Sequence, residues 1–194
     1  MIWRLFAPRP AGIHGRHYFL GGPYKVGLSP VSDTHVYLFL LETVAKREII
    51  PDAELYTYMH RMLSDYGGPL AELREGLNEN SPIVVRPLEA FLLPPPWHSG
   101  RVLLVGDAAH PTTPHLASGA GMAVEDAVVL AEELSRGGAD IEAMFRTYTD
   151  RRWHRCRAVV ENSLEIGRRE QAGRPPEEQT ALIGQTLDLL AQPL

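Results

Sequence analysis

The sequence predicts a two-part α+β chain, in which an antiparallel sheet is followed by a strand, a loop rich in glycine and proline, and several helices. Residues 1–42 alternate in hydrophobicity and are rich in Tyr, Phe, Val and Leu, whereas residues 141–190 are rich in Arg, Glu and Leu at helical spacing. Three prolines at 94–96 mark a stiff boundary between these patterns. We therefore expect parts of 1–93 and 94–194.

Four strands are expected at the start of the first part, in the segments IWRLFA, RHYFLG, YKVGLS and HVYLFLLE. Pro, Gly, Ser and Asp separate these segments, so they predict an antiparallel meander. A helix over 52–66 follows, because Leu55, Met59 and Met62 recur at helical spacing and glycines at 67 and 68 end the pattern. We expect a shorter helix over 70–77 and extended chain over 81–97.

The second part opens with the apolar run 102–105, which has no alternation and predicts a strand buried on both faces. A helix over 120–135 then carries one apolar stripe: Val124, Ala127, Val128, Ala131 and Leu134. Two further helices are expected over 141–168 and 176–190. The charged residues of 142–170, among them Arg146, Arg151, Arg152, Arg155 and Arg157, predict a solvated helix surface.

Composition excludes several classes of function. The 194 residues are 44% hydrophobic and 22% charged, as in ordinary soluble domains, and the formal net charge of −5 leaves no basic stripe for nucleic acid. The longest strictly apolar run, 36–41, is far too short for a membrane span. Cys156 is the only cysteine, which excludes an internal disulfide and a thiolate metal cage and suits the cytoplasm.

The segment GDAAHPTTPHLASGAG, residues 106–121, has the composition of a ligand-binding joint. Gly106 and Asp107 place a carboxylate at the end of a strand, where it can accept hydrogen bonds from the hydroxyls of a polyol. The small side chains at 108 and 109 permit close approach to the backbone, and the prolines at 111 and 114 restrict the loop. Gly119 and Gly121 open a helix whose free N–H groups suit a partially negative ligand edge.

Other interpretations of this segment stay open or fail. Asp107 could be an ordinary turn residue, since Asp is a common turn former. Asp107, His110 and His115 lack the spacing and outer-shell partners of a metal site, so we assign no metal. A hydrolase with Ser118 as its nucleophile would need glycine on both sides at 116 and 120, where the chain has Leu116 and Ala120. Hydrogen-bonded structural roles are expected for both histidines.

Residues 101–134, RVLLVGDAAHPTTPHLASGAGMAVEDAVVLAEEL, closely resemble the second flavin-binding motif of the single-component FAD-dependent monooxygenases related to para-hydroxybenzoate hydroxylase. The resemblance implies that Gly106 and Asp107 meet the ribityl chain of FAD and that Pro114 lies beside the isoalloxazine ring. It also implies that a helix start near the flavin pyrimidine edge is formed by Gly119, Ala120, Gly121 and Met122. Family members often have Gly-Gln-Gly where this chain has residues 117–119, Ala-Ser-Gly, so the contacts of that glutamine are not expected here.

The first part resembles, in pattern, the sheet that forms much of the substrate pocket in this family. The resemblance suggests that Tyr18, Tyr37 and Phe39 line a substrate pocket, with His14 or His35 at its rim. Tyr37 and Phe39 share a face under strand alternation. Because aromatic residues are common in strands, ordinary half-buried sheet residues are the more frequent explanation for such side chains, and this alternative stays open. The tryptophans, Trp3, Trp97 and Trp153, are expected in the core or at an interface.

The resemblance implies an enzyme in which FAD, reduced by NADH or NADPH, uses oxygen to hydroxylate an organic, aromatic or phenolic, substrate. The flavin carries the chemistry, so no catalytic side chain is assigned. The family's Gly-x-Gly-x-x-Gly turn and Asp-Gly motif are not found in the sequence, which begins in a strand pattern; we therefore expect the carboxyl-terminal portion of a longer enzyme. Its other half would cover residues 102–105 and the Val124 stripe, and without that half the chain would self-associate.

Two alternatives remain at this point. The chain could be a noncatalytic module that keeps this architecture and binds no FAD. It could also belong to a related flavoprotein that oxidises or reduces its substrate without inserting oxygen.

Overall fold

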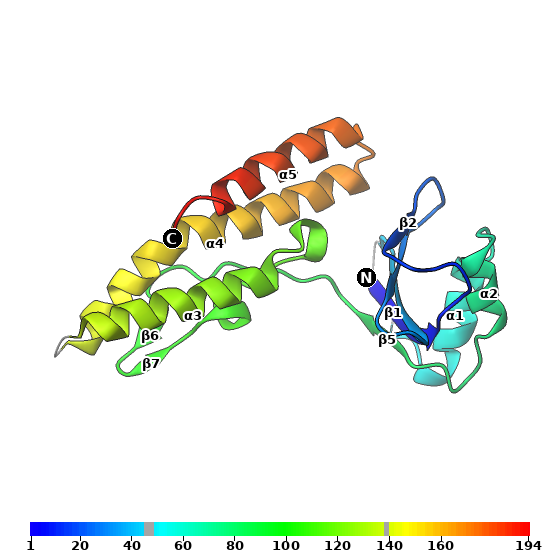
Figure 1. Ribbon diagram of the computed structural model, residues 1–194, viewed down its shortest axis with the longest axis horizontal. Helices are drawn as coiled ribbons and strands as arrows, with labels where there is room; N and C mark the ends of the chain where they lie inside the picture. The colour runs from blue at the N-terminus through cyan, green and yellow to red at the C-terminus, as the bar shows by residue number, and fades with distance from the viewer. Residues whose placement is uncertain (45–48, 138–139) are drawn as a thin grey trace. The chain divides into compact units, whose positions relative to one another are not determined.

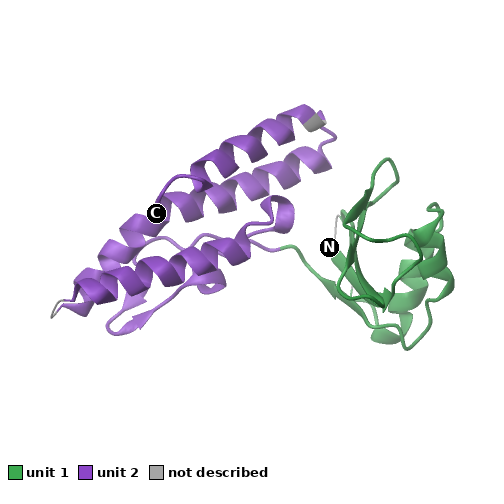
Figure 2. Cartoon of the chain, in the orientation of Figure 1, with its two compact units in different colours: residues 1–88 green, residues 89–194 purple. Residues whose placement is uncertain are grey.

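The computed structural model describes residues 1–44, 49–137 and 140–194, and it divides into two compact units, 1–88 and 89–194 (Figure 2). The division predicted at residues 93 and 94 lies just inside the second unit. Each unit has its own hydrophobic core.

The first unit is built on a five-stranded antiparallel sheet in the order β2-β3-β4-β1-β5. Its strands are β1 (Ile2–Pro8), β2 (His17–Phe19), β3 (Lys25–Pro30), β4 (His35–Leu41) and β5 (Ile83–Arg86). The four strands predicted at the start of the chain are present, but the simple meander is wrong. β1 pairs with β4 and β5 rather than with β2, because its buried side chains at Ile2, Trp3 and Leu5 need a central position with a neighbour on each edge.

Within the described residues of the first unit, the helices pack on one face of this sheet (Figure 1). The 3-10 turn η1 (Asp52–Glu54) leads into α1 (Leu55–Met62), and α2 (Pro69–Glu75) follows. α1 ends four residues before the predicted end at 66, because the chain turns at Ser64, whose N–H bonds to the Arg61 carbonyl. The core between helices and sheet includes Trp3, Leu28, Leu38, Leu40, Met59, Leu63 and Leu70. No described helix of the first unit packs on the opposite face of the sheet.

The second unit is mainly helical. It contains the strand pair β6 (His98–Ser99) and β7 (Val102–Leu103), the 3-10 turns η2 (Gly106–Ala108) and η3 (Pro114–Leu116), and the helices α3 (Gly119–Arg136), α4 (Ile141–Gln171) and α5 (Pro176–Leu190). The three helices run side by side, with α4 contacting both α3 and α5 (Figure 1). The predicted helix positions are confirmed to within a few residues. Among the described residues, no helix is both long and apolar enough to cross a bilayer.

The prediction of a strand buried on both faces at 102–105 is wrong for this chain. β7 has two residues and pairs only with β6 among the described residues, so no second layer covers it, and Val102 is 67% exposed. The apolar stripe of α3 is also uncovered, with Val124 64% exposed. α3 instead turns its other side toward α4 and buries Met122, Asp126, Val129 and Glu133.

Candidate functional site

The η2 turn begins at a position that requires glycine. Gly106 is buried and has φ 56°, in the left-handed region that side chains disfavour, and an added Cβ would come 3.3 Å from the Cβ of Ala123. The Gly106 carbonyl accepts hydrogen bonds from the N–H groups of Ala109 and His110, each at 2.9 Å. The turn therefore has a defined shape, and Asp107 stands exposed at its middle.

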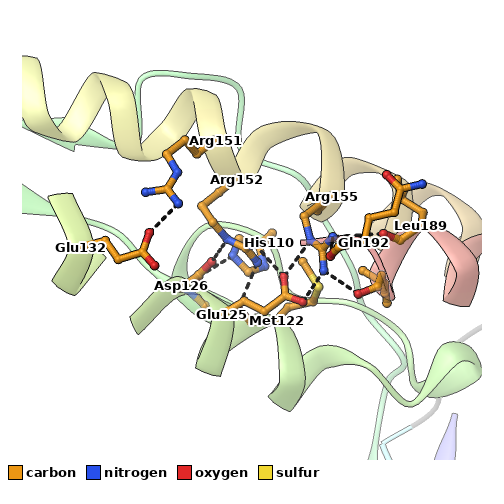
Figure 3. A network of polar contacts seen from close by, with 12 residues as sticks. His110, Met122, Glu125, Asp126, Glu132, Arg151, Arg152, Arg155, Leu189 and Gln192 are labelled. Atoms are coloured by element: carbon orange, nitrogen blue, oxygen red, sulfur yellow. Dashed lines mark hydrogen bonds and ion pairs between the residues drawn. The ribbon is translucent and has the colours of Figure 1, made fainter. Parts of the chain in front are cut away.

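Asp126 of α3 holds this turn through hydrogen bonds, and Figure 3 shows its carboxylate beside His110 and Arg152. Its Oδ2 accepts a hydrogen bond from the Gly106 N–H at 2.7 Å and lies 2.8 Å from the His110 Nε2. Asp126 is 1% exposed and His110 is 3% exposed, so both groups depend on protein partners. The expected structural role of His110 is confirmed.

Two arginines of α4 complete the network. Arg152, fully buried, donates from Nε to Asp126 Oδ1 at 2.7 Å and from Nη1 to Glu125 Oε2 at 2.6 Å. Arg155 bonds to Glu125 and donates to the backbone carbonyls of Leu189, Leu190 and Gln192 at the end of α5. The prediction that this charged surface is solvated is wrong for Arg152 and Arg155, which face inward because α3 presents carboxylates to them.

The arginines keep the network ionised. Burial opposes the charge on Asp126, but hydrogen bonds from His110 and Arg152 outweigh it and lower the pKa of Asp126. Burial likewise opposes the charge on Glu125, and the Arg155 and Arg152 hydrogen bonds lower its pKa. Burial raises the pKa of the nearby Cys156 thiol to about 12. The network is therefore a set of ion pairs beside a neutral thiol.

This network is a poor metal site, although His110, Asp126 and Cys156 bring potential ligand atoms within 4.8 Å of one another. Both oxygens of Asp126 already accept hydrogen bonds, and the Arg152 guanidinium touches one of them. A cation beside Arg152 would be repelled, and a protonated thiol is not a ligand. Of the residues considered for metal from the sequence, His110 and His115 each have protein partners, and Asp107 belongs to no cluster of potential metal ligands among the described residues.

The proline loop that follows η2 is held against the far half of α4. His115 Nδ1 lies 2.8 Å from the Thr113 hydroxyl, and His115 Nε2 lies 3.7 Å from a Glu170 carboxylate oxygen. Gly167 leaves room for the imidazole, because a Cβ there would come 2.9 Å from its Cε1. This confirms the structural role expected for His115. Pro114, which opens η3, stays exposed.

The start of α3 is open. Ser118, the residue before the helix, makes no capping hydrogen bond to it and donates instead to the Leu116 carbonyl at 3.0 Å. Ala120 and Gly121 are exposed, and a Cβ at Gly121 would meet nothing within 4 Å. Gly119 is partly buried, close to the Thr112 methyl group, and the Met122 side chain is buried. The N–H groups of Gly119, Ala120 and Gly121 thus have no side-chain acceptor from Ser118, whereas the Met122 N–H donates to the Ser118 carbonyl at 2.9 Å.

Together these elements can bind a ligand with both hydroxyl groups and a partially negative edge. Asp107 offers a carboxylate that, among the described residues, accepts no hydrogen bond, and the α3 start offers N–H donors.

Ala117, just before α3, has φ 51°, a left-handed conformation that costs a non-glycine residue about 1–2 kcal/mol. The left-handed conformation of Ala117 could not be predicted from the sequence, because alanine does not favour that conformation.

A second candidate surface is the open face of the first unit's sheet. Tyr18, 49% exposed, packs edge-on to Phe39 with ring centroids 5.9 Å apart, and Tyr37 lies beside Phe39 at 6.4 Å. Gly27, between Tyr18 and Phe39 in the sheet, is overlaid by the Phe39 ring, which a Cβ would overlap. The three predicted aromatics therefore form one cluster on one face.

The predicted rim residues differ from each other. His35 stacks on Phe6 with ring centroids 4.6 Å apart, which extends the aromatic face. His14 is exposed in the connection between β1 and β2. Arg4, which sequence reasoning did not select, lies directly across from Phe39 on the same face and is exposed. Strand alternation could have found it, since it follows Ile2 and precedes Phe6 at two-residue spacing.

The tryptophans are placed largely as expected. Trp3 and Trp97 are buried in the cores of the first and second units, and Trp153 packs partly buried beside Trp97, with ring centroids 6.1 Å apart.

Comparisons with known proteins agree with the flavin motif. Residues 89–163 match the protein family described as FAD binding domain. YetM of Bacillus subtilis (strain 168), named as an FAD-dependent monooxygenase, is 33% identical over 192 residues, which are 98% of this chain and 51% of YetM. The 3-hydroxybenzoate 6-hydroxylase of Polaromonas naphthalenivorans (strain CJ2) is 47% identical over 72 residues, 37% of this chain and 18% of that protein.

The fold is also similar to a solved structure, that of Klebsiella pneumoniae R204Q HpxO complexed with FAD. The TM-score is 0.74 and the identity 25%, over 94% of this chain and 49% of that one. The similarity extends over both units and identifies the architecture as that of the flavoprotein hydroxylases related to para-hydroxybenzoate hydroxylase. The chain spans about half the length of YetM and of HpxO.

The lowered pKa values of Glu125 and Asp126 predict an acid-sensitive second unit. Their unfolded pKa values are about 4.3 and 3.9, so the stability that they contribute is complete above those values and is lost as pH falls toward the lower folded values. Thermal melting followed by circular dichroism should show a steep loss of Tm below about pH 4.5. Asp126→Asn should flatten this dependence, whereas Glu142→Gln, at an exposed position, should leave it unchanged. Parallel curves for Asp126→Asn and the parent chain would contradict the assignment.

Proposed function

This chain belongs to the family of FAD-dependent monooxygenases, and on that premise we propose that it forms the riboflavin side of the FAD site in an enzyme that hydroxylates an organic substrate. NADH or NADPH would supply the electrons and O2 the inserted oxygen. The substrate is proposed to be aromatic or phenolic. Because the chain spans about half of its relatives' length, this activity is proposed for a complete protein that also contains the other half.

The observation that carries this proposal is the pairing of an unsatisfied carboxylate with an open helix start. An Asp that merely shapes a turn usually hydrogen-bonds nearby backbone, but the Asp107 carboxylate accepts no hydrogen bond from the described residues. The η2 turn is held by Asp126 at its buried first residue, Gly106, so Asp107 is presented outward by a fixed backbone. These features support a ligand role for Asp107 over the turn-residue alternative.

The residues present fit the riboflavin part of FAD. We propose that Asp107 accepts hydrogen bonds from ribityl hydroxyls, with Gly106 setting its direction. The N–H groups of Gly119, Ala120 and Gly121 would face the flavin pyrimidine edge, where the positive end of α3 favours electron density. Met122, predicted with them, would contribute only its place in the first turn, since its N–H already donates to the Ser118 carbonyl at 2.9 Å. The open space at Gly121 and the exposed ring of Pro114 would let the flavin approach. Bound FAD would supply the redox chemistry, so the chain itself needs to bind, orient and shield the cofactor.

We propose that the aromatic cluster of Tyr18, Tyr37 and Phe39 lines the substrate pocket. The three rings share one open sheet face, and the nearby Arg4 adds a cation. Such a surface suits a flat aromatic compound that carries an anionic or phenolic group. The 3-hydroxybenzoate in the name of one relative is a compound of this kind.

The other half of the enzyme is proposed to pack on the exposed apolar surface of the second unit. This surface comprises Val102, Val105, Val124, Val128 and Leu134. Apolar groups gathered in this way usually mark an interface, and self-association of the chain through them would follow from the same exposure.

We propose a cytoplasmic location, since the only cysteine, Cys156, is a buried free thiol and the nicotinamide donor is found there.

The function as a whole is tested by co-producing the chain with the flavin-binding half encoded in its genomic context. The combined protein should retain FAD, oxidise NAD(P)H faster when substrate is added, and release an oxygenated product. A combined protein that is folded but colourless would instead favour the noncatalytic module. Retained FAD with a product that lacks added oxygen would favour the related oxidoreductase.

Asp107→Ala should weaken FAD binding by the combined protein about 10- to 100-fold, which corresponds to the roughly 1.5–3 kcal/mol of hydrogen bonding to a charged group. Titration of the apo protein with FAD, followed by flavin fluorescence, measures this change. Asp150→Ala, at an exposed position of α4, serves as the matched control and should bind FAD normally. An unchanged affinity in Asp107→Ala would return Asp107 to the role of a turn residue.

Phe39→Ala should raise the KM for the aromatic substrate several-fold while FAD affinity stays the same, because the ring is proposed to contact substrate and not cofactor. Val84→Ala, on the same sheet face toward its other edge, is the control. Steady-state kinetics measures the KM of each variant for the substrate, and a flavin titration measures its affinity for FAD. If both variants behave like the parent enzyme, the three rings are ordinary sheet residues.

The pair of substitutions Val124→Glu and Val128→Glu should abolish self-association of the isolated chain and prevent its assembly with the other half. Sedimentation velocity measures both states. Leu187→Glu, at an exposed apolar position on α5, should affect neither. A parent chain that is a monomer and binds no apolar dye would argue against the proposed interface.

A further inference from the structure

We propose that Asp126 is a positioning residue of the cofactor site, which holds the η2 turn so that the Asp107 carboxylate faces the ligand. This inference rests on the proposed function in one respect, namely that Asp107 binds FAD. Asp126 itself is buried and would not touch the cofactor.

A single oxygen of Asp126 contacts residues on both sides of Asp107, and Figure 3 shows the contact with His110. Oδ2 is bonded to the N–H of Gly106, the first residue of η2, and to the side chain of His110, just after it, at 2.7 and 2.8 Å. The His110 N–H in turn bonds to the Gly106 carbonyl at 2.9 Å. These contacts close a small ring of hydrogen bonds behind Asp107, so that the backbone on both sides of it is fixed.

The other oxygen ties this ring to the long helix. Oδ1 accepts from Arg152 Nε at 2.7 Å, and Arg152 is itself fixed by Glu125 and by the Met122 carbonyl. The carboxylate therefore cannot rotate without breaking an ion pair between α3 and α4. The direction of Asp107 is in this way set by the packing of two helices as well as by its own loop.

The contacts require a carboxylate. Gly106, His110 and Arg152 all approach the two oxygens of Asp126, and an ionised carboxylate can accept all of these hydrogen bonds. The amide of Asn has nearly the same shape but only one oxygen, and its NH2 group would face the donor of either Gly106 or Arg152. Asp126→Asn should therefore release either the turn or the ion pair with little change in volume.

Glu133 provides a matched control on the same helix. It is also a buried carboxylate of α3 paired with an arginine of α4, since its Oε1 accepts from Arg151 Nη1 at 2.6 Å, and it also pairs with Arg136. It makes no contact with η2 among its described partners. Glu133→Gln should cost stability, as Asp126→Asn does, without altering the cofactor site. The comparison separates a positioning role from a merely structural one.

Hydrogen exchange tests the hold on the turn without any cofactor. In the purified chain, Asp126→Asn should speed the exchange of the amides of Gly106 and His110 at least tenfold relative to amides in the middle of α4. Glu133→Gln should change the exchange rates of the Gly106 and His110 amides and of the amides in the middle of α4 by the same factor. Unchanged protection at Gly106 in a folded Asp126→Asn chain would overturn the proposal.

A double-mutant cycle tests the link to Asp107 in the combined protein with FAD. Asp126→Asn alone should weaken FAD binding about tenfold, and adding it to Asp107→Ala should weaken binding by less than about twofold more, because Asp126 acts through Asp107. Fully additive losses would overturn that link, and so would a normal FAD affinity in Asp126→Asn. If Asp126→Asn does not fold, His110→Leu, which keeps the pair of Asp126 with Arg152, should show the same pattern at a smaller size.

The outcomes distinguish this inference from the proposed function. If Asp107→Ala leaves FAD binding intact, the cofactor role of Asp107 fails, while the exchange data still decide whether Asp126 holds the turn. If Asp107→Ala weakens FAD binding but Asp126→Asn does not, the cofactor site stands and the positioning role is wrong.

Discussion

The ion pair between Asp126 and Arg152 is the interaction on which the second unit depends. It lies between α3 and α4 with both side chains buried, and it reaches the η2 turn through Gly106 and His110. Buried charges lose hydration that only good geometry and further hydrogen bonds can offset. Here, both oxygens of Asp126 accept hydrogen bonds, and the remaining nitrogens of the Arg152 guanidinium donate to Glu125 and to the Met122 carbonyl. The packing of α3 against α4 and the geometry of the η2 turn therefore depend on the same carboxylate.

The second unit combines a fixed interior with an exposed surface at the candidate cofactor site. The ion pairs and the His115 contact with α4 fix the loop from inside, whereas Asp107, Pro114 and the start of α3 remain exposed on the outside. A site that is built before its ligand arrives loses less conformational entropy on binding. The sheet shows the same combination, since Gly27 makes room for Phe39 and no described helix of the first unit covers the aromatic face.

The sequence predicted the elements well but not which sides of them are buried. The stripe of Val124, Val128 and Leu134 is a correct helical stripe, yet it is exposed, because the side with Asp126 and Glu133 has the stronger partners in α4. Ordinary patterning ranks carboxylates as solvent-facing. One signal was available, since acidic pairs at 125–126 and 132–133 match arginines at 151, 152 and 155. No comparable signal in the sequence indicated the left-handed backbone conformation of Ala117.

The central claim, that the chain presents Asp107 to the riboflavin end of FAD, is tested most directly by a crystal structure of the combined protein with FAD. The account predicts an Asp107 oxygen within hydrogen-bonding distance, about 2.5–3.0 Å, of a ribityl hydroxyl, and the flavin pyrimidine edge facing the N–H groups at the start of α3. A flavin bound elsewhere, or an Asp107 side chain turned to solvent beside a bound flavin, would contradict it.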